Sequence, residues 1–325
     1  MPLLDSLKDI RNSIEYSNFT DVLQTVIDDI EGGKTFSLAL AEHPQVFDKV
    51  YVTLVRVGEE TGNLSDVLKD LAETIRWQDE LASHTRKIMI YPAIVTVVVI
   101  CVVSFLMIYL MPQLLPFIKN IGTEIPFYTK VLISISGAFV DYWYVIFSLP
   151  LMIYAAVVIV ANKNIAVRYF IDGIKLKIWL IGPLVSKIKL ARFANYFAMM
   201  YSSGITVLDA LGISENMVDN LVLEDSINKA RSSIAEGSQI SESFESVGVF
   251  PSMIVRMLKV GEDTGAMDEA LLNVSYFYNR EVKESIDKLE PAMMPVLTII
   301  LGGIMMWIMM AVLGPVYDAV STIKI

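Results

Sequence analysis

Acidic residues gather at two matching places in this chain, and they are its best candidates for binding chemistry. They occupy equivalent positions around a repeated phrase: Glu59, Glu60 and Asp66, then Glu262, Asp263 and Asp268. Carboxylate oxygens are the ligands that Ca²⁺ and Mg²⁺ prefer, so Glu59 and Asp66 are weak candidates for a divalent cation. The acids could instead form a surface for a protein partner, or favour a helix N-terminus electrostatically. The residue types leave all three interpretations open.

The repeated phrase itself is marked by glycines. Val55-Arg-Val-Gly-Glu-Glu-Thr-Gly62 is matched by Leu258-Lys-Val-Gly-Glu-Asp-Thr-Gly265. In the first copy we expect Gly58 and Gly62 to adopt backbone angles that other residues avoid. Partner-docking candidates are taken from both copies, together with one acid that precedes the last apolar stretch. They are Gly58, Glu59, Glu60, Gly62, Gly261, Glu262, Asp263, Gly265 and Glu290.

The other motifs do not build a nucleotide site or a catalytic site. Gly33-Lys34-Thr35 resembles the end of a phosphate-binding loop, but position 28 is Asp where that loop needs a glycine. The preceding segment also reads as a helix, so we interpret Gly33 as a helix end. His43 and His84 lack spaced partners, and no Ser-His-Asp, HExxH or Cys-Xaa-Xaa-Cys arrangement is present. We therefore predict a protein that is not an enzyme and uses no cofactor.

The composition is that of an integral membrane protein. Hydrophobic residues make up 54% of the 325 residues, charged residues only 19%, and the mean hydropathy is +0.54. Three uncharged stretches, at 88–111, 143–161 and 292–317, are long enough to cross about 30 Å of hydrocarbon as helices. The single cysteine, Cys101, excludes an intramolecular disulfide and a cysteine metal site. A net charge of -10 opposes nucleic-acid binding.

Basic residues close to the three stretches predict the orientation in the membrane. They are frequent before the first stretch and after the second, whereas the connection at 112–142 has only Lys119 and Lys130 and the C-terminus only Lys324. Since Lys and Arg concentrate on the cytoplasmic side, both polar domains and the N-terminus should be cytoplasmic. The 112–142 connection and the C-terminus should then be periplasmic.

The repeat defines the domain organisation, because a polar helical domain followed by a membrane-length stretch occurs twice. We expect an all-α integral membrane protein with two homologous cytoplasmic helical-bundle domains and three transmembrane helices. A helix at about 189–203 opens the second domain, and the first domain is shortened at its N-terminus by comparison. The predicted segments are two cytoplasmic domains at 1–87 and 162–290, transmembrane helices at 88–111, 143–161 and 291–317, a periplasmic connection at 112–142 and a periplasmic tail at 318–325.

Two features of the membrane region bear on function. The stretches carry no Asp, Glu, Lys, Arg or His, and ion-coupled transporters usually need such a group at depth, so a transporter is only a remote alternative. Gly302 and Gly303 could let helices pack closely, or could simply tolerate lipid.

In the stretch from Lys163 to Arg192, basic residues are interspersed with apolar and aromatic residues. It could form an interfacial helix attracted to anionic lipid, could reflect the topology, or could do both.

Several motifs in order carry a resemblance to a known family. Besides the doubled phrase, they are Tyr91-Pro92, then Pro112, Phe117, Gly122, Pro126 and Thr129, then Gly182-Pro183, Arg192-Phe193-Ala194 and Ser203-Gly204, and finally Glu290-Pro291. The chain resembles, over nearly its whole length, the inner-membrane platform proteins of type IV pilus and type II secretion systems. These proteins share a duplicated type II secretion F domain.

The resemblance implies a scaffold in the bacterial inner membrane. Such a platform would contact a ring-shaped hexameric assembly or retraction ATPase in the cytoplasm, pilins or pseudopilins, other inner-membrane components of the machine, and the lipid bilayer. It would self-associate at least as a dimer. The expected task is to couple the ATPase to insertion or extraction of pilin subunits. The equivalent platform of a type II secretion system, acting on pseudopilins, is the alternative.

Overall fold

The computed structural model describes residues 3–14, 17–113, 116, 127–179 and 182–322. Every regular element in these ranges is a helix, which confirms the all-α fold class. Contacts divide the chain into two compact units. One combines residues 1–80 with 169–283, and the other combines 81–168 with 284–325.

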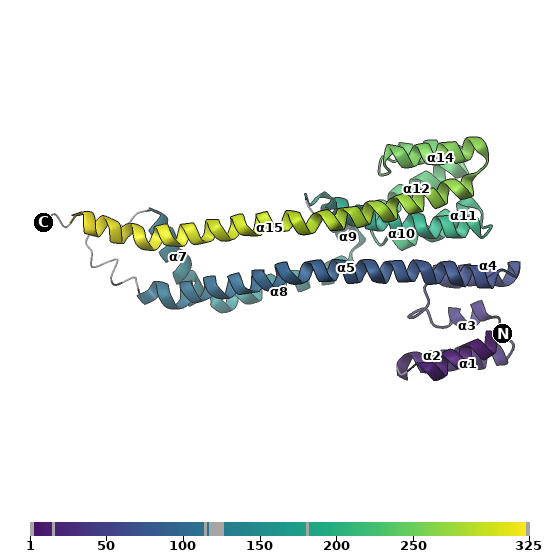
Figure 1. The fold of residues 1–325 in the computed structure, drawn as a ribbon, viewed down its shortest axis with the longest axis horizontal. Helices are drawn as coiled ribbons and strands as arrows, with labels where there is room; N and C mark the ends of the chain where they lie inside the picture. The colour runs from purple at the N-terminus through teal and green to yellow at the C-terminus, as the bar shows by residue number, and fades with distance from the viewer. Residues whose placement is uncertain (1–2, 15–16, 114–115, 117–126, 180–181, 323–325) are drawn as a thin grey trace. The chain divides into compact units, whose positions relative to one another are not determined.

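The first helical module lies in residues 3–80 and is built from short amphipathic helices (Figure 1). They are α1 (Leu3–Ser13), α2 (Ser17–Glu31), α3 (Phe36–Ala41), α4 (Lys49–Thr61) and the beginning of α5 (Leu64–Phe105). Val26, Leu40 and Leu54 are fully buried in its core. Gly33, between α2 and α3, has a φ of 93°, a value that favours glycine. Thr35 then caps α3, so the helix-end interpretation of Gly33-Lys34-Thr35 is confirmed.

The second module repeats this arrangement with additional helices at its front (Figure 1). Its elements are α9 (Ile165–Lys177), α10 (Gly182–Ser202), α11 (Val207–Ser214), η2 (Glu215–Val218), α12 (Leu221–Ala235), α13 (Ile240–Ser246), α14 (Ser252–Thr264) and the beginning of α15 (Met267–Thr322). Phe193 and Phe197 of α10 pack against Phe244 and Phe250, and the last two rings lie 4.6 Å apart. Burial of large aromatic rings gives this module a dense core.

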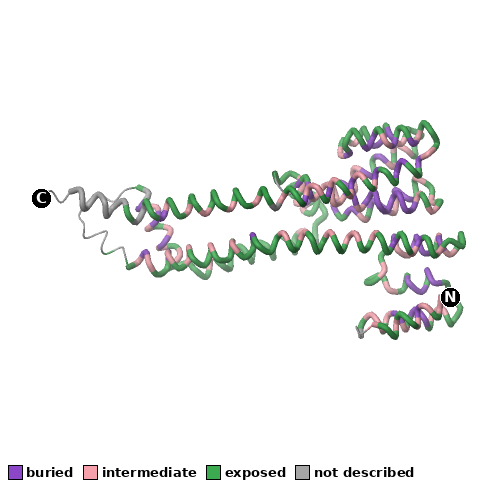
Figure 2. Tube along the Cα trace, in the orientation of Figure 1, coloured by how far each residue is buried: buried purple, intermediate pink, exposed green. Residues whose placement is uncertain are grey.

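Three helices of the described chain are long and apolar enough to cross a membrane, as the sequence predicts. The qualifying segments are Leu64–Gln113, Trp143–Ala161 and Met267–Met310. The second of these belongs to α8 (Trp143–Lys163), and the other two belong to the helices that begin in the modules. Their apolar side chains are largely exposed, whereas buried residues gather in the helices of the two modules (Figure 2). Each module is therefore joined to a spanning helix without a break in the helix.

The connection at 112–142 contains a helix that the sequence analysis did not anticipate. This helix, α7 (Phe127–Asp141), packs against the π-helical turn η1 (Leu106–Leu110) that follows α5. The side chains buried together are Met107, Met111, Leu132 and Ile308. Ser136 Oγ also donates a hydrogen bond to the carbonyl oxygen of Met107 at 2.6 Å. Phe117, Gly122 and Pro126, which contribute to the family resemblance, lie outside the described residues.

Candidate functional site

The first acid of each repeated phrase binds backbone amides inside its own module. In the first copy, the Glu59 carboxylate accepts hydrogen bonds from the backbone N–H groups of Phe36, at 2.6 Å, and Ser37, at 3.0 Å. These amides belong to the first turn of α3, where backbone donors have no partner within the helix. The carboxylate therefore satisfies two free donors and faces the positive end of the helix dipole.

The second copy has the same arrangement with one additional hydrogen bond. Glu262 accepts from the backbone N–H groups of Ile240, at 2.7 Å, and Ser241, at 3.2 Å, and from the Ser241 hydroxyl, at 2.8 Å. The side chains of Glu59 and Glu262 are half-buried. We call these two residues the inner acids. Each one ties the end of a 13-residue helix, α4 or α14, to the start of a shorter helix about 22 residues earlier in the chain.

The glycines of the phrase have two different structural roles. Gly62 and Gly265 end α4 and α14 with φ of 75° and 73°, so the expected special backbone angle is confirmed at Gly62. The same expectation is wrong at Gly58, which is buried within α4 and has no positive φ. A Cβ atom at Gly58 would lie 3.1 Å from the Leu64 Cα atom. This glycine is needed because the next helix approaches closely.

The equivalent contact in the second copy is tighter. A Cβ atom at Gly261 would lie 2.4 Å from the Cβ atom of Ala270, a distance that neighbouring side chains do not tolerate. The threonines complete each turn, because the hydroxyl groups of Thr61 and Thr264 donate to the carbonyls of Val57 and Val260 at 2.7 Å. The repeated phrase thus builds a helical corner. There α4 meets α5, or α14 meets α15, and a glutamate holds a third helix.

The second acid of each phrase faces solvent. Glu60 and Asp263 are exposed, and we call them the outer acids. Asp66 is also exposed. In the described ranges, no group of three His, Cys, Asp or Glu residues is arranged to hold a metal ion. The backbone of Glu290 is helical, but its side chain lies outside the described part of the chain.

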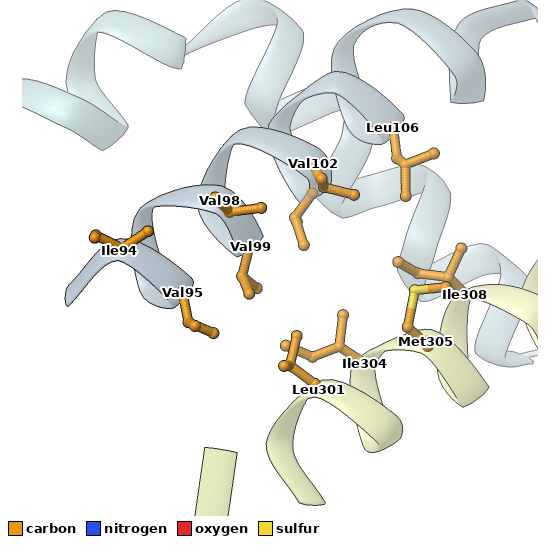
Figure 3. Close-up of a pocket in the computed structure, with 11 residues that line it drawn as sticks. Ile94, Val95, Val98, Val99, Val102, Leu106, Leu301, Ile304, Met305 and Ile308 are labelled. Atoms are coloured by element: carbon orange, nitrogen blue, oxygen red, sulfur yellow. The ribbon is translucent and has the colours of Figure 1, made fainter. Parts of the chain in front are cut away.

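A second candidate site is an apolar groove in the membrane-spanning unit. It has a volume of about 260 Å³ and lies between α5 and α15 (Figure 3). All side chains that line it are aliphatic or methionine, and they include Val95, Val98, Val102, Leu301, Ile304 and Met305. In Figure 3 the labelled side chains of the two helices face a common hollow. The groove therefore offers shape and apolar surface, but no charge or hydrogen-bonding side chain.

Among the residues that the structure describes, Gly302 and Gly303 make no tight helix contact. Both are exposed, and a Cβ atom at either position would meet no atom within 4 Å. They lie next to Leu301, which lines the groove.

Glu215 is a buried acid of the second module that no sequence motif marks as a candidate. Its Oε1 atom lies 3.4 Å from Nη1 of Arg231. Burial raises the pKa of the Glu215 carboxyl, and the neighbouring Arg231 guanidinium opposes that shift. Gly212 leaves space for the arginine, because a Cβ atom there would collide with Nη1. This ion pair joins η2 to α12.

The fold and the duplicated corner define a class of protein: an all-helical, multi-pass membrane protein with two helical modules, each continuous with a spanning helix. Comparison with known proteins identifies the family. The family described as "Type II secretion system (T2SS), protein F" matches residues 1–112 and 193–315, so each matched segment holds one copy of the phrase. The chain belongs to this family of inner-membrane platform proteins of type IV pilus and type II secretion systems.

Relatives from both kinds of machine are similar along nearly the whole chain. The chain is 33% identical to the type IV pilus assembly protein PilC of Thermus thermophilus, over all of this chain and 80% of the relative. It is also 33% identical to the PilC protein of Myxococcus xanthus, over all of this chain and 78% of that relative. Identity to the type II secretion system protein F of Xanthomonas campestris is 28%, over 93% of this chain and 74% of the relative.

Proposed function

We propose that this chain is the non-enzymatic inner-membrane platform of a type IV pilus machine. It couples a cytoplasmic assembly or retraction ATPase to the insertion or extraction of pilin subunits, and it acts as a dimer or a larger oligomer. Higher identity to two relatives named for type IV pilus assembly supports the pilus role. The equivalent platform of a type II secretion system, acting on pseudopilins, is the second candidate because protein F of that system is also similar.

The apolar groove between α5 and α15 carries this proposal. Within a bilayer, helices associate through van der Waals packing, because lipid chains are as apolar as the side chains. A groove lined only by aliphatic and methionine side chains suits the apolar helical stalk of a pilin. It offers no polar group to an ion or a polar solute, which argues against a transporter.

Photo-cross-linking in native membranes tests the groove. A photoreactive amino acid at Val98 or Met305, both groove positions, should cross-link to pilin. The same amino acid at Ile153, on the exposed face of α8, is the matched control and should give mainly lipid adducts. Equal pilin cross-linking from the control and groove positions would show that pilin does not select the groove. Cross-linking to pseudopilins instead would assign the secretion role.

The proposed orientation places both modules in the cytoplasm and α7 in the periplasm. Cysteine labelling checks it in a Cys101→Ser background. Phe127→Cys, at a side chain that is 80% exposed, should react with a membrane-impermeant maleimide in cells whose outer membrane alone has been opened. Ser238→Cys, in an exposed turn of the second module, should react only after the inner membrane is opened. The reverse pattern would overturn the orientation.

We also propose that the ATPase docks on the outer acids rather than the inner ones. The carboxylates of Glu59 and Glu262 already bind backbone amides within the modules. Glu60 and Asp263 are exposed beside them and can meet a basic partner surface. Glycines 58, 62, 261 and 265 contribute indirectly, because they shape the corner that presents the outer acids. Glu290 is a separate docking candidate near the start of the third span.

A further inference from the structure

Helix α9 begins almost immediately after a membrane span ends. The span α8 ends at Lys163, and α9 begins at Ile165. Asn164, between them, accepts a hydrogen bond from the backbone N–H of Ala166 at 2.9 Å and so caps the new helix. Chain connectivity alone therefore keeps the first turn of α9 at the surface of the membrane that α8 crosses.

The outer side of α9 is more apolar than a helix in water needs to be. Phe170 is 69% exposed and Ile174 is 46% exposed, and their spacing of four residues places them on one face. Trp179, just beyond the helix, is 87% exposed. Tryptophan is enriched at membrane interfaces, where its ring can be both buried and hydrated. This apolar surface is suited to the boundary between headgroups and acyl chains.

The exposed charged side chains of the same segment are all basic. Lys163, Arg168, Lys175 and Lys177 are basic, and Asp172 is the one acid between residues 163 and 179. Asp172 is only 3% exposed, and its carboxylate accepts hydrogen bonds from the backbone N–H of Leu221, at 3.2 Å, and from Lys175 Nζ, at 2.9 Å. Because the acid faces inward, the outer surface is positive and complements anionic headgroups.

The buried acid also fixes α9 to the second module. The backbone carbonyl of Asp172 accepts a hydrogen bond from the Asn220 side chain at 3.4 Å. Asn220 in turn caps α12, because its side-chain oxygen accepts from the backbone N–H groups of Val222 and Leu223 at 3.1 Å. The N-terminus of α12 is therefore tied to α9 by side-chain and backbone hydrogen bonds.

We propose that α9 is an interfacial helix that binds anionic phospholipid on the membrane face where α8 ends, and that Asp172 links this lipid contact to the second module. Phe170, Ile174 and Trp179 enter the headgroup region, while Lys163 and Lys177 bind lipid phosphates. This role does not depend on which fibre machine the chain serves. It limits the movement of the second module relative to the bilayer surface.

Spin-label accessibility tests the proposal on the full chain. In a Cys101→Ser background, labels are placed at Phe170→Cys and Trp179→Cys, and at Ser238→Cys as a water-exposed control. The protein is reconstituted in nanodiscs of phosphatidylcholine, with or without phosphatidylglycerol. Trp179 is the decisive site, because it lies well beyond Lys163 and the chain connection does not by itself hold it at the membrane. Two reagents are used, oxygen and a water-soluble nickel complex, and the accessibility of each label to oxygen is divided by its accessibility to the nickel complex. In anionic discs, this ratio should be several-fold higher for both labels than for the control.

A charge variant checks the headgroup contact. Lys163→Gln together with Lys177→Gln should lower the ratio at Trp179→Cys in anionic discs to its value in neutral discs. A water-like ratio at position 179 in anionic discs would overturn the proposal, and so would poor access of both reagents, which indicates a protein cover. A lipid-like ratio that is equal in neutral and anionic discs would overturn the assignment to anionic lipid. Far-ultraviolet circular dichroism confirms that each labelled protein is folded.

Discussion

Replacement of Glu262 by alanine is expected to destabilise the second module by about 2–4 kcal/mol, because it leaves three partly buried donors without an acceptor. Those donors are the backbone N–H groups of Ile240 and Ser241 and the Ser241 hydroxyl. Glu59→Ala should destabilise the first module less, since two donors lose their acceptor there. Thermal unfolding of the purified protein in detergent, followed by circular dichroism, measures both effects.

The neighbouring acid supplies a matched control for this prediction. Asp263→Ala changes an exposed carboxylate next to Glu262, so the free energy of unfolding should change by no more than about 0.5 kcal/mol. Glu262→Gln, which keeps one acceptor oxygen, should give an intermediate loss. If Asp263→Ala and Glu262→Ala destabilised the protein equally, the inner acid would have no special structural role.

Gly261→Ala is the second substitution with a large expected effect. The new Cβ atom would lie 2.4 Å from the Cβ of Ala270, so α14 and α15 must move apart at the corner. Overpacking of this kind costs about 1–3 kcal/mol. Gly58→Ala should cost less, because the nearest atom there is 3.1 Å away. The same thermal unfolding measurement compares the two variants.

Two further variants identify the cause of the Gly261 effect. Ala270→Gly removes the colliding methyl group, so the double variant Gly261→Ala with Ala270→Gly should regain part of the lost stability. Gly302→Ala, in the third span, is the control because a Cβ atom there meets nothing within 4 Å. A Gly261→Ala protein as stable as the unsubstituted chain would show that the two helices are not in close contact at this corner.

The corners are placed where a force on a module would reach the membrane. The helices that leave them, α5 and α15, continue into the first and third spans without interruption. Both helices also line the apolar groove. In the proposed function, a displacement that the ATPase imposes at a corner therefore passes along a helix to the site where pilin would bind.

Much of this architecture could be predicted from the sequence, because it follows from local patterns. Uncharged stretches of sufficient length predict the spans, the repeated phrase predicts two modules, and Gly33 and Gly62 end helices as glycines commonly do. The helix α7 is not among these features: its 15 residues are too few for a span and lie within the 112–142 stretch that the sequence predicts as a connection. Its position depends on packing against η1, which no local pattern reveals.

The roles of the candidate site residues depend on contacts between distant residues. Glu59 and Glu60 are adjacent residues of the same type. Only Glu59 accepts hydrogen bonds from the backbone amides of α3, more than 20 residues earlier in the chain. Likewise, Gly58 is buried close to Leu64 and Val67. The sequence alone does not distinguish it from a glycine in a turn. The groove combines side chains from α5 and α15, and the sequence alone does not show that these helices face each other.

In the proposed function, the inner acid of each corner holds the module together while the outer acid meets the ATPase. Co-purification of the ATPase with the double variant Glu60→Lys, Asp263→Lys tests it most directly. We predict a clear loss of captured ATPase, with membrane insertion and thermal stability equal to those of the unsubstituted protein. Undiminished capture of the ATPase by this stable double variant would contradict the claim.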